Sequence, residues 1–191
     1  MTDPWLTRWL PLIRERAGAL PVLEIGCGHG DDTATLAARG LRVIAFDLSR
    51  ASVAAARLRV PAAQIECRDI RDPFPDAARG LGVVLASLSL HYFAWDETVA
   101  IVQRVRDVLR PGGVLLCRLN STQDAHFGAG QGTRIEENYF ERDGQRKRFF
   151  DEDAVQRLFA EGWNVLSVEH RSTRKYLRQK ALWEGVLERT G

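Results

Sequence analysis

The sequence has few cysteines, no long apolar run and almost no excess of charge. Its three cysteines stand far apart, each in or beside an apolar run, so reduced and mostly buried thiols are expected rather than a disulfide framework. The sequence has no cluster of His, Cys and Asp residues with the spacing of metal ligands, so it predicts no metal site. The N-terminus lacks a basic segment followed by an apolar run, and no stretch approaches the roughly 18 apolar residues of a membrane span. These absences predict a cytoplasmic protein with no membrane partner.

The charge balance makes a small ligand the default partner. The sequence has 27 Lys and Arg residues and 25 Asp and Glu residues. The net charge of the protein is therefore too small to attract it to nucleic acid. An apolar fraction of 45% and a length of 191 residues fit a single globular domain over residues 1–191. Whether the protein is a monomer or a homodimer stays open.

Apolar runs typical of strands alternate along the chain with helical patterns. A leading helix is predicted within residues 1–18, with Asp3 as its cap and Pro4 in its first turn. Further helices are predicted at 31–38, from the cap Ser49, at 96–109 and from the cap Asp151. The predicted strands are 20–25, 41–46, 64–67, 81–90, 114–119, 164–170 and 180–187. This alternation predicts a parallel sheet with helices on both faces.

Residues 120–148 break this alternation. The stretch is polar, carries four glycines and has no sustained period. Connections beyond about 12–15 residues inside a compact domain are usually functional or disordered. We therefore expect an insertion that covers the active site as a lid.

A glycine-rich loop runs from Glu24 to Gly30, after an apolar strand and before a helix. Glycines let the backbone turn tightly and approach a ligand, and the helix start behind them offers free amide donors. The spacing is GxGxG rather than the GxGxxG of dinucleotide sites, and Asp31 would repel a pyrophosphate. A structural turn and an NAD site remain as alternatives.

This loop resembles the first motif of class I S-adenosylmethionine-dependent methyltransferases. Asp47, at the tip of the second strand, is placed to accept hydrogen bonds from two ribose hydroxyls, as the matching acid of that family does. Asp69 and Ile70, after the third strand, resemble the segment that holds the adenine, and residues 109–113 resemble the turn before the fifth strand. Four motifs in the correct order cover about residues 20–120.

The resemblance implies a seven-stranded, Rossmann-like α/β sheet, mostly parallel, whose last strand runs antiparallel. It implies S-adenosylmethionine as the cofactor and S-adenosylhomocysteine as the product. Asp47 has a loop-solvating or helix-capping alternative, Asp69 a turn alternative, and Cys27 is expected only as a small residue under the cofactor. The predicted cofactor-binding residues are Glu24, Gly26, Cys27, Gly28, Gly30, Thr33, Asp47, Leu48, Asp69, Ile70 and Ser87.

The predicted catalytic residues are His91 and Tyr92, which follow the fourth strand at the carboxyl end of the sheet. Methyl transfer is an in-line displacement that needs an oriented nucleophile and, for some acceptors, a base, so His91 is either that base or part of the pocket wall. The predicted substrate-binding residues are Arg118, Asn120, Arg134 and Tyr139, whereas residues 146–148 are expected to form a solvated charged face.

The run from Leu85 to Phe150 is similar to bacterial tellurite-resistance-like methyltransferases. An Asn/Asp-Pro-Pro-Tyr motif is missing at the fourth strand, which argues against DNA as the substrate. The predicted function is therefore methyl transfer to a small molecule. A methyltransferase acting on protein or RNA, a non-catalytic cofactor-binding protein and an NAD-dependent oxidoreductase remain as alternatives.

Overall fold

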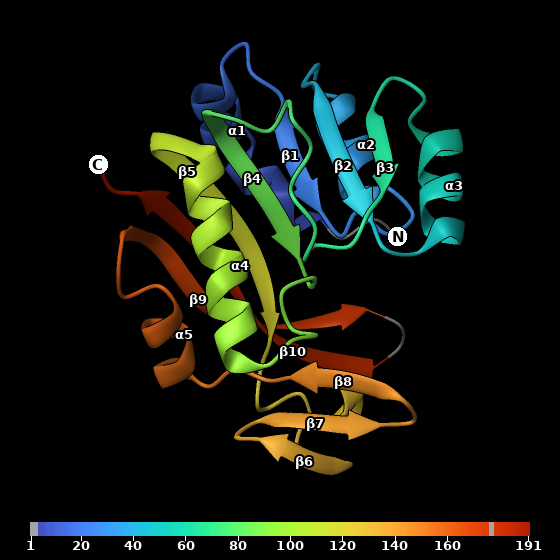
Figure 1. Ribbon diagram of the computed structural model, residues 1–191, viewed down its shortest axis with the longest axis vertical. Helices are drawn as coiled ribbons and strands as arrows, with labels where there is room; N and C mark the ends of the chain where they lie inside the picture. Colours follow the sequence, from blue (N-terminus) through green and yellow to red (C-terminus); the bar gives the residue numbers. More distant parts are fainter. Residues whose placement is uncertain (1–3, 176–177) are drawn as a thin grey trace.

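A seven-stranded sheet forms the centre of the protein (Figure 1). The structure, a computed structural model, describes residues 4–175 and 178–191, so the predicted cap Asp3 lies outside the described residues. The strand order is β3-β2-β1-β4-β5-β10-β9, with β3, β2, β1, β4 and β5 parallel and β10 antiparallel to both of its neighbours. The predicted mostly parallel sheet with an antiparallel last strand is confirmed. The strands are β1 (Val22–Ile25), β2 (Val43–Asp47), β3 (Gln64–Cys67), β4 (Leu81–Ser87), β5 (Leu109–Asn120), β9 (Trp163–Lys175) and β10 (Arg178–Arg189).

Helices cover both faces of this sheet, because its central strands are buried on both sides. On one face pack α4 (Trp95–Val108) and α5 (Glu152–Leu158). On the other face pack η1 (Pro4–Trp9), α1 (Leu10–Ala17), α2 (Asp31–Ala37) and α3 (Arg50–Arg59). Each fully buried Leu or Ile side chain in these layers contributes about 1.5–3 kcal/mol. Among the helices of the described ranges, none is both long and apolar enough to cross a membrane.

Two predicted helix caps are confirmed. Ser49 Oγ accepts a hydrogen bond from Ser52 N at 3.2 Å, and Asp151 Oδ1 accepts one from Ala154 N at 2.8 Å. Each bond satisfies an amide that has no partner within its own helix. The caps therefore fix where α3 and α5 begin.

The predicted fourth strand is too long at its carboxyl end. β4 ends at Ser87 instead of Leu90, because Leu88 adopts a left-handed conformation with φ of 57°. The Leu88 amide still donates to the carbonyl of Arg118 at 2.9 Å. The chain thus turns over the end of the sheet, and the residues after Leu88 leave the sheet plane.

The insertion at residues 120–148 has secondary structure that the sequence analysis did not predict. After η2 (Ala125–Phe127), three short strands form an antiparallel sheet, β6 (Thr133–Glu136), β7 (Tyr139–Arg142) and β8 (Gln145–Arg148). Asp143 and Gly144 join β7 to β8, with φ of 52° and 74°. A two-residue Asp-Gly turn with positive φ at both positions is the preferred hairpin connection, so the signal was present in the sequence. This sheet lies beyond the carboxyl ends of the parallel strands (Figure 1).

Candidate active site

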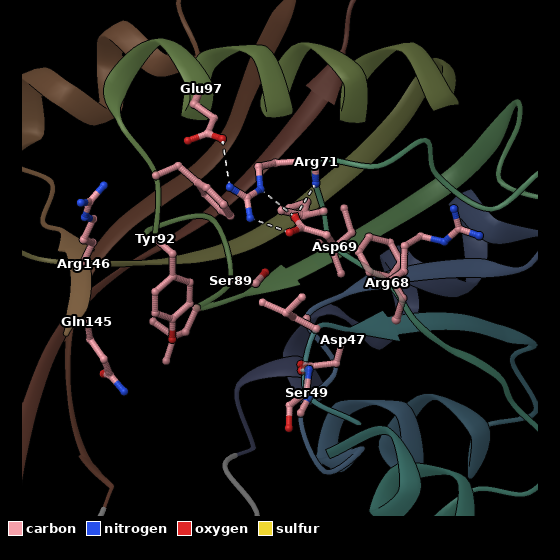
Figure 2. Close-up of a pocket in the computed structure, with 18 of the residues that line it drawn as sticks. Asp47, Ser49, Arg68, Asp69, Arg71, Ser89, Tyr92, Glu97, Gln145 and Arg146 are labelled. Carbon is pink, nitrogen blue, oxygen red and sulfur yellow. Dashed lines mark hydrogen bonds and ion pairs between the residues drawn. The ribbon is translucent and has the colours of Figure 1, made fainter. Parts of the chain in front are cut away.

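A cavity of about 990 Å³ lies between the carboxyl ends of β1 to β4 and the insertion sheet (Figure 2). Its size suits a cofactor together with a small second ligand, since ligand sites usually measure about 300–1,000 Å³. Of the predicted site residues, those that line it are Gly26, Gly28, Asp47, Leu48, Asp69, Ile70, Tyr92 and Tyr139. The cavity sits at the point of the sheet where open α/β folds bind their ligands.

Two glycines of the loop are required by the geometry of this wall. Gly26 has φ of 71°, and a Cβ there would lie 2.5 Å from Ser89 Cβ. Gly28 has φ of 53°, and a Cβ there would meet nothing within 4 Å. The first glycine therefore allows two chain segments to touch, and the second leaves its backbone open to the cavity.

Asp47 is held rigidly at the end of β2. Its Oδ2 accepts a hydrogen bond from Gly28 N at 2.9 Å, and its Oδ1 accepts one from Ser49 N at 2.8 Å. An ionised carboxylate has about four acceptor positions, so two remain for hydroxyl groups of a ligand. Asp47 thus orders the glycine loop, a role that the sequence analysis did not predict, and also keeps acceptors on the cavity side.

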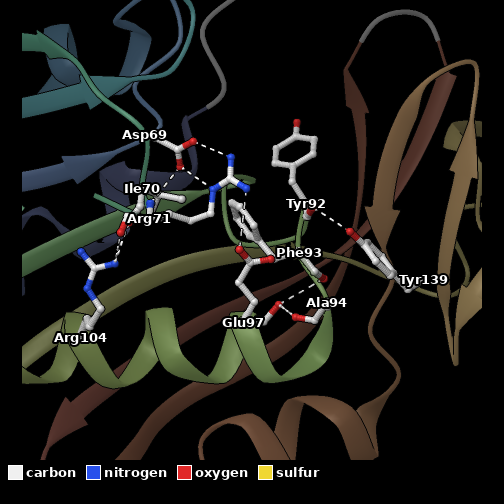
Figure 3. A network of polar contacts seen from close by, with 10 residues as sticks. Asp69, Ile70, Arg71, Tyr92, Phe93, Ala94, Glu97, Arg104 and Tyr139 are labelled. Atoms are coloured by element: carbon white, nitrogen blue, oxygen red, sulfur yellow. Dashed lines mark hydrogen bonds and ion pairs between the residues drawn. The ribbon is translucent and has the colours of Figure 1, made fainter. Parts of the chain in front are cut away.

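Asp69 is engaged by Arg71 (Figure 3). Its Oδ1 accepts from Arg71 N at 2.9 Å and Nε at 3.0 Å, and its Oδ2 accepts from Arg71 Nη2 at 2.6 Å. The hydrogen bonds from Arg71 lower the pKa of this carboxyl group. The hydrogen bond from the backbone amide of Arg71, two residues further along the chain, is typical of a turn. A turn residue was the alternative interpretation of Asp69 in the sequence analysis. Beside it, Ile70, Phe46 and Leu48 give the cavity an apolar slot.

Glu24 and Thr33 lie behind the cavity wall. Glu24 is 3% exposed, and Thr33 Oγ1 donates a hydrogen bond to its Oε2 at 2.5 Å, which ties β1 to α2. Burial, reinforced by the negative charge of Asp32, raises the pKa of Glu24 to about 8. The Glu24 carboxyl group is therefore largely protonated below that pH in the folded protein.

This raised pKa predicts a pH-dependent stability. Between 4.5, the ordinary value, and about 8, the folded state holds a proton on Glu24 that the unfolded state releases. The free energy of unfolding should then fall as the pH rises through this window, by at most about 1.4 kcal/mol per pH unit. Glu24→Gln should flatten the dependence, measured by urea unfolding at several pH values. The exposed Glu15→Gln is the matched control, and equal slopes in Glu24→Gln and the unmodified protein would contradict the assignment.

Three other predicted cofactor residues also lie away from the cavity. Cys27 is buried in the core under α2 and α3, and burial raises its thiol pKa to about 12. A Cβ on Gly30 would lie 3.1 Å from Ala56 Cβ, so this glycine allows the start of α2 to pack on α3. Ser87 Oγ accepts a hydrogen bond from Arg118 Nε at 2.9 Å. These residues shape the loop and strand ends that carry the wall.

The two predicted catalytic residues are separated by the structure. Tyr92 lines the cavity, whereas His91 is 3% exposed and lies behind it, with the two ring centroids 4.3 Å apart. Burial, together with the charges of Lys180 and Lys147, lowers the pKa of His91 to about 3, so its imidazole is neutral at ordinary pH. Burial also raises the pKa of Tyr92, which keeps its hydroxyl protonated. The placement favours the wall role of His91 over the base role.

Of the four predicted substrate residues, only Tyr139 reaches the cavity. Its hydroxyl donates to the carbonyl of Tyr92 at 3.1 Å, which joins the insertion sheet to the end of β4 (Figure 3). Arg118 is buried, and its guanidinium lies 4.5 Å from the Trp5 ring centroid. Asn120 is also buried, and its Oδ1 accepts a hydrogen bond from Lys180 Nζ at 3.0 Å. Arg134 is exposed on β6.

Several residues that the sequence analysis missed also line the cavity. Ser89 is the most informative, because its buried Oγ has no hydrogen-bond partner in the described part of the chain. A small polar residue just past a parallel strand was the available signal. Glu141, Gln145 and Arg146 come from β7 and β8, whose existence was not predicted.

One further expectation needs correction, and another is confirmed. Residues 146–148 were expected to form a solvated face, but Arg148 is 4% exposed and is bound to Glu136. The expectation of reduced, mostly buried thiols is confirmed, because the three cysteines are free and Cys27 and Cys117 are buried, while Cys67 is exposed.

A known family model matches the part of the chain that carries the glycine loop and Asp47. The sequence model of a family described as a methyltransferase domain matches residues 22–113, the segment that contains β1 to β4 and the Gly26 to Asp47 wall. Residues 22–113 are therefore similar to a methyltransferase domain, in line with the class of S-adenosylmethionine-dependent enzyme that the sequence predicts.

The chain is also similar in sequence to curated relatives and in fold to solved structures. A trans-aconitate 2-methyltransferase of Paracidovorax citrulli is 33% identical over 114 residues, covering 58% of this chain and 43% of the relative. The chain therefore spans less than half the length of that curated relative. An S-adenosylmethionine-dependent methyltransferase from Methanosarcina mazei has the same fold, with a TM-score of 0.77, 16% identity and coverage of 94% and 97% of the two chains. So does magnesium protoporphyrin IX methyltransferase from Synechocystis, solved with S-adenosylhomocysteine bound, with a TM-score of 0.72, 16% identity and coverage of 97% and 81%.

The residues of the cavity fit S-adenosylmethionine, the cofactor that the sequence analysis predicted. Asp47 has free acceptors for ribose hydroxyls, Ser89 has an unpaired hydroxyl, and Gly28 exposes backbone without a side chain. Four carboxylates and three guanidinium groups line the cavity, an excess of one negative charge. A cavity of that sign suits a ligand with a cationic sulfonium centre.

Proposed function

We propose that the protein transfers the methyl group of S-adenosylmethionine to a small-molecule acceptor within this cavity. The observation that carries the proposal is the convergence of Gly28, Asp47 and Ser89 on one side of a cavity whose other side is the insertion sheet. That arrangement leaves room beside the cofactor residues, next to Tyr92 and Tyr139.

The sulfonium group of the cofactor supplies an activated methyl carbon. The residues of the chain then hold the reactants in line and reduce their access to water. Asp47 would accept hydrogen bonds from the ribose hydroxyls, Ile70 would contact the adenine, and the Ser89 hydroxyl would be available to the amino acid end of the cofactor. Fixing two reactants in a reactive geometry is worth about 7–11 kcal/mol of the barrier. This places most of the catalysis in positioning.

The insertion sheet acts in this proposal as a fixed cover of the acceptor side. Tyr139, Glu141 and Arg146 close the cavity opposite the parallel strands, which favours an acceptor small enough to enter whole. The relative that methylates trans-aconitate, a small acid, supports the same acceptor class. Methylation of protein or RNA is the alternative, and it would need an open surface at this point.

Two finer assignments stay predictions. Membership of the tellurite-resistance-like subgroup rests on the similarity over Leu85 to Phe150 alone. A cytoplasmic location likewise rests on composition. An activity screen with labelled S-adenosylmethionine over thiols, oxyanions, amines, phenols and carboxylates tests the acceptor class. Tight S-adenosylhomocysteine binding without transfer to any of them would favour a non-catalytic protein.

Asp47→Ala should weaken S-adenosylhomocysteine binding by about 10- to 100-fold, because two acceptor hydrogen bonds to a charged group are lost. Isothermal titration calorimetry measures this directly. The exposed Asp76→Ala is the matched control and should bind as the unmodified protein does. Asp47→Asn, which keeps one acceptor oxygen, should fall between the two. Tighter binding of NAD than of S-adenosylhomocysteine would contradict the proposed cofactor.

A further inference from the structure

The insertion sheet separates the cofactor cavity from a second cavity of about 400 Å³. Successive side chains of a strand point to opposite faces of its sheet. Accordingly Glu141 and Arg146 line the cofactor cavity, while their neighbours Arg142 and Lys147 line the second one. Gln145 alone, of the residues described as lining either cavity, borders both.

Three phenylalanines form the apolar part of the second cavity. Phe140 comes from β7, Phe149 follows β8, and Phe127 comes from η2 on the opposite side. The Phe140 and Phe149 ring centroids are 6.4 Å apart and tilted by 55°. Phe127 and Phe140 are partly exposed, so the cavity presents ring surface that a flat apolar ligand would cover.

The charged groups of this cavity leave one cation without a counter-ion. Arg142 Nε lies 3.5 Å from Asp143 Oδ2, and its guanidinium also binds Gln131. Lys147 is half-buried, and its side chain forms neither a hydrogen bond nor an ion pair with any described residue. An ammonium group with no partner in the protein is available to pair with the carboxylate of a ligand.

Lys180, a second lysine near this cavity, already has a counter-ion. Lys180 Nζ lies 3.0 Å from Asp124 Oδ2 and 4.7 Å from the Phe127 ring centroid, so its charge is already paired. Burial, and after it the charges of both lysines, lowers the pKa of His91, so its neutral imidazole adds no further positive charge. The excess positive charge on this side of the insertion therefore belongs to Lys147.

We propose that this second cavity is a binding site for a small aromatic carboxylate. The ring of the ligand lies against Phe127, Phe140 and Phe149, and its carboxylate pairs with the ammonium group of Lys147. The site is separate from the cofactor cavity and does not depend on methyl transfer. Because the β7–β8 hairpin carries residues of both cavities, an occupant here contacts the same hairpin that covers the acceptor side.

Cinnamate and its uncharged isostere cinnamamide test this proposal by calorimetry. Cinnamate should bind the unmodified protein, and Lys147→Gln should weaken that binding at least about tenfold, the usual worth of a charge-assisted contact. Cinnamamide has no carboxylate to pair with Lys147. Its affinity for the unmodified protein should therefore not exceed the affinity of cinnamate for Lys147→Gln. Arg146→Gln, one position along β8 on the opposite face, is the matched control and should leave cinnamate binding unchanged.

Binding of S-adenosylhomocysteine separates this test from that of the proposed function. Lys147→Gln should bind S-adenosylhomocysteine as the unmodified protein does, whereas Asp47→Ala should bind it more weakly and still bind cinnamate. The proposal is overturned if cinnamate shows no saturable binding up to about 10 mM, too weak for a built site. Displacement of cinnamate by S-adenosylhomocysteine, or loss of its binding in Arg146→Gln but not in Lys147→Gln, would place the carboxylate in the cofactor cavity and equally overturn it.

Discussion

Gly26→Ala is expected to lower the free energy of unfolding by about 2–5 kcal/mol and to abolish measurable cofactor binding. An L-residue at positive φ costs about 1–2 kcal/mol, and forcing an extra methyl group into a packed site costs about 1–3 kcal/mol more. The methyl group would lie 2.5 Å from Ser89 Cβ, so the loop or the end of β4 must move. Either movement displaces Ser89 or Gly28 from the cavity wall. Urea unfolding and calorimetry with S-adenosylhomocysteine measure the two effects.

Two other glycines separate the causes of this loss. Gly40 has φ of 77°, and a Cβ at this position would meet nothing within 4 Å, so Gly40→Ala should show the backbone cost alone and keep cofactor affinity. Gly28 also has a positive φ, of 53°, and a Cβ at this position would meet no atom within 4 Å. Because Gly28 lines the cavity, the methyl group of Gly28→Ala would enter it. Gly28→Ala should be about as stable as Gly40→Ala and still bind the cofactor at least about tenfold more weakly. Full affinity in Gly26→Ala would show that the contact with Ser89 does not shape the site.

Asp124→Ala is expected to destabilise the protein by about 3–5 kcal/mol, because it leaves a buried ammonium group without its partner. The Asp124 side chain is fully buried, its Oδ2 lies 3.0 Å from Lys180 Nζ, and its Oδ1 accepts from Ala181 N at 3.1 Å. These bonds join the segment before η2 to β10. Burial lowers the pKa of Lys180 while the pair with Asp124 raises it, so loss of Asp124 favours the neutral amine. The destabilisation should therefore be smaller at alkaline pH.

A double variant tests whether the charge or the packing is responsible. Asp124→Asn combined with Lys180→Met removes both charges and keeps an acceptor for Ala181 N, and it should recover most of the lost stability. The exposed Asp76→Ala is the control and should change stability by less than about 0.5 kcal/mol. If Asp124→Ala is no less stable than this control, the ion pair contributes nothing to the attachment of the insertion.

The sequence by itself determined the central sheet and placed the cavity at the carboxyl end of its parallel strands. Apolar runs of strand length, the caps Ser49 and Asp151, and the glycine spacing are local signals, because backbone conformation and burial of a strand depend on nearby residues. Asp47 and Asp69 could be placed for the same reason. In a parallel sheet, residues that follow neighbouring strands meet at one edge, whatever the details of packing.

Only the tertiary structure decided which loop residues face the cavity and which lie behind it. Glu24, Thr33 and Cys27 belong to the same loop and helix start as Gly28, yet they are buried behind the cavity wall because α2 packs on β2 and α3. The separation of His91 from Tyr92 depends in the same way on the left-handed turn at Leu88, which no propensity of leucine predicts. The acceptor side depends on pairing of β6, β7 and β8 across the insertion, and three short polar strands carry too little hydrophobic periodicity to reveal which of their faces covers the cavity.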